Sequence, residues 1–101
     1  MAMPVRLTHA DVAHAFVDRY RENFKAIRTN RNTIEVWVKG ADREDFIEDV
    51  KRYHLRRVLR TYLDWVFDCW PEPKPLKLRN ANFLNCALRE IVSLLYAPEG
   101  L

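Results

Sequence analysis

The sequence predicts a mainly α-helical domain of three main helices, with a small β-hairpin between the first and second helices. Three observations support this prediction: an apolar stripe at helical spacing after a capping residue, a short β-branched segment that alternates apolar and polar residues, and two long amphipathic segments separated by prolines. The chain has 101 residues, which is the length of one domain. We therefore treat residues 1–101 as a single domain.

The first helix is predicted at about residues 9–23. Thr8 is its N-cap, and Asp11 stands three residues later, in the position of a capping box. Phe16 and Tyr20 follow four residues apart, which places both on one face of a helix. This face would pack against the rest of the domain.

The hairpin is predicted at about residues 25–38. In its second strand, Ile34, Val36 and Val38 alternate with polar positions and share one face. Trp37 lies on the other face, where it either covers the hairpin against a helix or stays exposed for a partner. A two-stranded hairpin is marginally stable in water, so we expect it to pack against helices.

The second half of the chain predicts two more helices. The long helix covers about residues 43–68, with Asp42 as its N-cap. The proline-rich residues 71–75 form a stiff, extended connector, and the last helix covers about residues 80–96. This last helix is apolar over more than half of its circumference, which indicates either central burial or a partner.

Composition and charge narrow the classes of function. The chain carries 17 Lys and Arg against 14 Asp and Glu, and residues 51–101 hold nine of the basic and five of the acidic residues. A modestly basic half permits an acidic partner such as nucleic acid. The two glycines, Gly40 and Gly100, lie sixty residues apart, so the glycine-rich loops that cradle phosphates in nucleotide-binding enzymes are excluded.

The residues that usually carry catalysis or bind metals do not form a site. His9 and His14 are five residues apart, about 140° around a helix, and cannot chelate one metal ion. Ser93 lies in an apolar helical run, and Cys69 and Cys86 lack metal-ligand spacing and are interpreted as reduced packing residues. No segment approaches eighteen consecutive apolar residues. The sequence predicts a cytoplasmic, non-enzymatic protein without metal, cofactor or membrane span.

A basic run in the long helix is the candidate nucleic-acid site. Its arginines and lysine would contact phosphates, and a tyrosine between them would stack on a base or anchor the strand. The run consists of Lys51, Arg52, Tyr53, Arg56, Arg57 and Arg60. The sequence therefore predicts a phosphate-contacting face on this helix.

The alternative interpretation of this run is a solvated helix face held by ion pairs between residues four apart. Glu48 can pair with Arg52, and Asp64 with Arg60, each pair contributing a few tenths of a kcal/mol. The other two arginines of the run have no acidic residue three or four positions away. These two unpaired arginines favour the nucleic-acid interpretation.

Several short motifs occur in a characteristic order along the chain. Residues 16–20 read F-V-D-R-Y in the first helix, residues 36–40 read V-W-V-K-G in the second strand, and residues 78–84 form a basic, polar start to the last helix. In this order the motifs resemble the D5-type N-terminal domain, and the related helix-bundle modules, of phage, viral and plasmid primase-helicases. That family usually carries a second tryptophan a few residues after the glycine, whereas this chain has A-D-R-E at residues 41–44.

The resemblance implies a non-catalytic accessory domain of DNA replication. Such a domain would bind single-stranded or template-primer DNA and act beside a helicase or primase domain. No ATPase motif follows in these 101 residues, so helicase activity is not expected. The resemblance instead implies an excised domain or a stand-alone relative.

A different function class is a protein–protein interaction module, such as a small adaptor or a virus-encoded inhibitor. The wide apolar circumference of the last helix supports it, and exposure of Phe83, Leu94, Leu95 and Trp70 in a monomer would favour it. The same helix predicts a partner interface at Phe83, Leu88 and Leu95, which would form a homodimer across a two-fold axis. The alternative for these residues is central burial in the domain.

Overall fold

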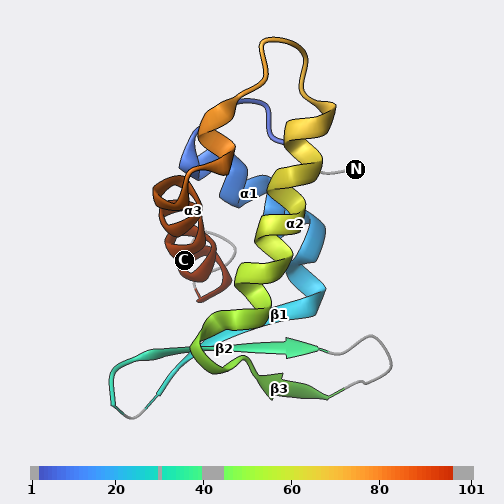
Figure 1. The fold of residues 1–101 in the computed structure, drawn as a ribbon. Helices are drawn as coiled ribbons and strands as arrows, with labels where there is room; N and C mark the ends of the chain where they lie inside the picture. The colour runs from blue at the N-terminus through green and yellow to red at the C-terminus, as the bar shows by residue number, and fades with distance from the viewer. Residues whose placement is uncertain (1–2, 30, 40–44, 97–101) are drawn as a thin grey trace.

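The computed structural model describes residues 3–29, 31–39 and 45–96. Within these residues, three α-helices stand on one face of a three-stranded antiparallel sheet of order β1-β2-β3 (Figure 1). The helices are α1 (His9–Tyr20), α2 (Tyr53–Cys69) and α3 (Ala81–Tyr96), and the strands are β1 (Phe24–Arg28), β2 (Ile34–Lys39) and β3 (Phe46–Glu48). Short 3-10 helices lie at Arg21–Asn23 (η1), Val50–Arg52 (η2) and Leu76–Arg79 (η3).

The prediction of a mainly α fold with a two-stranded hairpin is wrong, because the domain is α+β with a third strand. β3 pairs antiparallel with β2, and Ile47 is the register partner of Val38. The sequence predicts residues 43–52 as the first turns of the long helix, but pairing of β3 with β2 satisfies backbone groups that a hairpin would leave at an open edge. The predicted N-cap, Asp42, lies outside the described residues.

The start of α1 is the predicted one. The Thr8 hydroxyl oxygen accepts a hydrogen bond from the backbone N–H of Asp11 at 3.1 Å, and the hydroxyl donates to the Asp11 carboxylate at 3.0 Å. Thr8 itself has an extended backbone, as an N-cap requires. The helix ends at Tyr20 and continues as the 3-10 helix η1 to Asn23, the predicted end of the first helix.

The start of α2 is built differently. Lys51 and Arg52, just before the helix, both have left-handed backbones with φ of 55° and 59°. The cap is Asp49, whose carboxylate accepts hydrogen bonds from the backbone N–H groups of His54 and Leu55, both at 2.8 Å. Asp49 is only 7% exposed, and its own N–H donates to a carbonyl of β2 at 2.8 Å. This one residue therefore fixes the first turn of α2 to the sheet.

The connector between α2 and α3 is bonded to the end of α2 through Lys74. The Lys74 ammonium donates hydrogen bonds to the Phe67, Asp68 and Trp70 carbonyls at the end of α2, at 3.2, 2.9 and 2.7 Å. A cation at this position satisfies carbonyl groups that the helix leaves unpaired and is favourable to the helix dipole. η3 follows and leads into α3.

The core lies between the three helices and the inner face of the sheet. α3 packs against both α1 and β1, and Phe83, Leu88 and Leu95 are buried there. Central burial is thus the interpretation of α3 that the structure supports, and these three side chains are not available as a surface. Tyr62 of α2 is also buried, and burial raises the pKa of its hydroxyl to about 12.

Candidate nucleic-acid interface

Four of the six predicted site residues meet in one open groove between α2 and the start of α3, with a volume of about 390 Å³. The four lie three, four and seven residues along α2 from the first, so they share one face of the helix. The opposite face of α2 is apolar and buried, which turns this face outward. The groove is lined by Tyr53, Arg56, Arg57 and Arg60 of α2, and by Ala81 and Leu84 of α3.

The arginines of the groove differ in how they are held. Arg56 donates to the Asn85 side-chain oxygen at 2.8 Å, and Arg60 donates to the Leu78 carbonyl at 3.1 Å. Each guanidinium has five N–H donors, so one hydrogen bond positions it and leaves the others available. Arg57 is exposed, and among the described residues no hydrogen bond or ion pair engages it. The groove thus presents one free and two positioned cations.

Tyr53 supplies an aromatic surface at the edge of the groove. It is the first residue of α2, and 62% of its surface is exposed. A ring this exposed contributes little to the core, whereas an aromatic face beside arginines is a common platform for a nucleic-acid base. Its place at the helix start depends on the Asp49 cap, which sets where α2 begins.

The ion pairs expected for a solvated helix face do not form. Arg52 donates to the Ile34 carbonyl at 3.3 Å, and Arg60 uses the carbonyl contact described above. The ion pair between Arg6 and Asp11, at 3.4 Å, lies in the N-terminal part of the chain and not at the groove. The positive charge of the groove is therefore not neutralised by direct contact with described carboxylates.

The other two predicted site residues do not line the groove. Arg52 precedes α2 and connects it to β2 through its carbonyl contact, so its role is structural. Lys51 is exposed in the left-handed turn before the helix. Sequence periodicity placed both on the helix face, but the helix begins only at Tyr53.

Sequence reasoning missed the α3 side of the groove. Ala81, Leu84 and Asn85 reach the basic residues only because the connector folds α3 back beside α2. No pattern in the chain encodes this contact. The one available signal is the basic, polar stretch at residues 78–84, which marks the start of the last helix.

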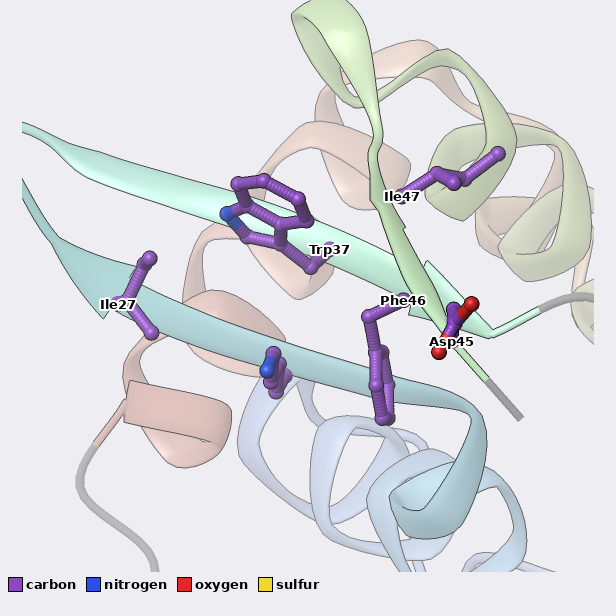
Figure 2. Close-up of a pocket in the computed structure, with 6 residues that line it drawn as sticks. Ile27, Trp37, Asp45, Phe46 and Ile47 are labelled. Atoms are coloured by element: carbon purple, nitrogen blue, oxygen red, sulfur yellow. The ribbon is translucent and has the colours of Figure 1, made fainter.

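Other predictions from the sequence concern metal ions, membrane spans, the two cysteines and Trp37. No group of three His, Cys, Asp or Glu side chains among them is placed to hold a metal ion, and none of their helices is both long and apolar enough to cross a bilayer. Cys86 is half-buried, but Cys69 is exposed and is not the packing residue that the sequence predicts. Trp37 covers no helix: it lies on the outer face of the sheet, beside a hollow of about 720 Å³ (Figure 2).

Comparison with known proteins adds no relative, since no family model, no curated protein and no solved structure matches the chain. The resemblance to D5-type domains therefore rests on the sequence motifs alone. The chemistry of the groove carries the functional argument.

Proposed function

We propose that this chain is a non-catalytic nucleic-acid-binding domain that holds single-stranded or template-primer DNA along the groove of α2. The observation that carries the proposal is the convergence of Arg56, Arg57 and Arg60 with an exposed Tyr53 in that groove. The arginines would pair with the negative charges of the phosphates, and the tyrosine ring would stack on a base.

The dimensions of the groove suit a short stretch of one strand. From Tyr53 to Arg60 the helix rises about 10 Å. Arg57 is free to follow a phosphate, while Arg56 and Arg60 are held in place by their hydrogen bonds. These contacts follow the backbone and carry no base-specific readout, which fits an accessory that holds DNA for another protein.

The role beside a primase or helicase rests on the sequence resemblance and is part of the same proposal. Exposure of Phe83, Leu94, Leu95 and Trp70 would favour the interaction-module alternative. Phe83 and Leu95 are buried, and Leu94 and Trp70 are partly buried against the core. These four side chains therefore do not form the exposed surface that would favour the alternative.

The test is titration of labelled single-stranded and template-primer DNA at several salt concentrations. Arg56→Ala together with Arg57→Ala should weaken binding and reduce the slope of log K against log salt by about 1.4, since each lost single-strand phosphate contact contributes about 0.7.

A matched control separates site-specific contacts from net charge. Arg57→Ala and Arg31→Ala both remove one exposed arginine, but Arg31 lies in the turn between β1 and β2, outside the groove. Only Arg57→Ala should weaken binding. Equal weakening by both variants, or no binding by the wild type at low ionic strength, would contradict the proposal.

A further inference from the structure

The outer face of the sheet carries an apolar diagonal. The helices cover the other face, so Ile27 of β1, Trp37 of β2 and Phe46 of β3 lie on the uncovered side (Figures 1 and 2). The register sets their arrangement. The partner of Ile27 on β2 lies two residues before Trp37, and the partner of Phe46 lies two residues after it. Ile27 is 40% exposed and the two rings are half-buried. This stripe crosses all three strands.

Charged residues flank the diagonal, with two lysines on one side and two glutamates on the other, and Asp45 lies next to Phe46 at the hollow. Lys25 is the register partner of Trp37 on β1, and Lys39 is the partner of Phe46 on β2, so both lysines lie on one side of the stripe. Glu48 is the partner of Trp37 on β3, and Glu35 is the partner of Ile27 on β2, so both glutamates lie on the other side. The face is therefore divided into a lysine side and a glutamate side.

We propose that this face binds the same face of a second copy of the chain, across a two-fold axis that runs along the apolar diagonal. A rotation of 180° about that axis lays the diagonal of one copy over the diagonal of the other. The same rotation places the lysine side of each copy over the glutamate side of its partner. The face is self-complementary in charge as well as in apolar character, as a two-fold interface requires.

The register sets the angle at which the two sheets would cross. The diagonal advances one strand, about 4.8 Å, for every two residues, about 6.8 Å, so it is inclined to the strands by roughly 35°. The strands of the two copies would then cross at roughly twice that angle, between the aligned and orthogonal classes of sheet packing and closer to the orthogonal one. Within one copy, the Lys25 ammonium lies 4.6 Å from the centre of the Phe46 ring, so this lysine is already positioned beside the stripe.

Such a dimer is expected to be weak and reversible. Three short strands offer much less than the roughly 800 Å² per partner of a standard stable interface. The inference does not depend on the proposed function, because the outer face of the sheet lies away from the α2 groove and the test contains no DNA. Sedimentation of the wild type from about 10 µM to about 1 mM should show a monomer–dimer equilibrium in the micromolar range or above.

Two complementary double variants test the charge pattern. Lys25→Glu with Lys39→Glu makes the four strand residues that flank the diagonal all negative, and Glu35→Lys with Glu48→Lys makes these four all positive. Each variant alone should dimerise at least about tenfold more weakly than the wild type. A mixture of the two should recover association, because each like-charged face then meets its opposite.

A control variant makes the same change in net charge at positions away from the sheet. Lys77→Glu with Arg89→Glu changes the net charge as much as Lys25→Glu with Lys39→Glu, at exposed positions in η3 and α3. This variant keeps the wild-type sheet face and should dimerise as the wild type does, so a weaker dimer in the sheet variants would not come from the change in net charge. Melting curves confirm that each variant is folded. A wild type that stays monomeric throughout, charge variants that dimerise like the wild type, or a complementary mixture that stays monomeric would overturn the inference.

Discussion

The starts of α1 and α2 show two ways in which one chain can begin a helix. Thr8 caps α1 through the N–H of a residue three positions later, on an exposed surface, with an extended backbone. Asp49 caps α2 through N–H groups five and six positions later, from a buried position, across two left-handed residues. The first cap is a local device, whereas the second also connects the helix to the sheet through its own N–H.

The difference lies in what each start must position. α1 needs only to present an apolar face to the core. α2 must begin where β3 ends and must turn its basic face toward α3 within a few residues. The left-handed residues Lys51 and Arg52 provide that sharp change of direction, at a cost of about 1–2 kcal/mol each, which the Asp49 carboxylate helps to offset.

The largest effect is expected at the buried cap. Asp49→Ala removes the acceptor for two N–H groups, one of them buried, and should lower the free energy of unfolding by about 2–3 kcal/mol. Asp49→Asn keeps one amide oxygen as acceptor and should cost less. Denaturant unfolding measures both, and an Asp49→Ala cost no larger than that of the exposed cap of α1 would contradict the comparison.

A smaller effect is expected at the start of α1. Thr8→Ala removes one hydrogen bond to an N–H that water can reach, so the free energy of unfolding should fall by about 1 kcal/mol or less. Thr8→Ser retains the hydroxyl and is the matched control, with a cost close to zero. A larger loss of unfolding free energy for Thr8→Ala than for Asp49→Ala would show that burial does not determine the difference between the two caps.

The smallest effect should have the opposite sign. Lys51→Gly relieves a left-handed backbone at a side chain that makes no described hydrogen bond or ion pair, and should raise the free energy of unfolding by about 0.5–1 kcal/mol. Lys51→Ala keeps the Cβ atom that disfavours this conformation and should give no gain. Thermal melts of both variants provide the measurement. Equal melting temperatures would show that this turn stores no strain.

Local signals in the sequence predicted the local features of the structure. Thr8 and the four-residue spacing of Phe16 and Tyr20 placed α1, and the alternation around Val36 placed β2. The third strand and the start of α2 were not predicted from the sequence. Asp49 lies outside the spacing of ordinary caps, and the N–H groups that it binds come close to it only because two left-handed residues intervene.

The same distinction between local and tertiary features applies to the candidate site. The positions of Tyr53, Arg56, Arg57 and Arg60 follow from helical spacing alone, and the structure brings these four together. Arg52 was assigned to the same face because the helix was expected to start earlier, and it contacts β2 instead. The α3 wall of the groove depends on tertiary packing, which periodicity within one helix does not contain.

The packing of α1 against α3 has a consequence for the synthesis of the chain. α1 packs against α3, which follows it in the chain and ends at Tyr96. At about 5–20 residues per second, the ribosome needs roughly 4–15 s to progress from the end of α1 to the end of α3. During that interval α1 lacks the contacts that α3 makes with it in the folded domain. The core is complete only after α3 has been synthesised.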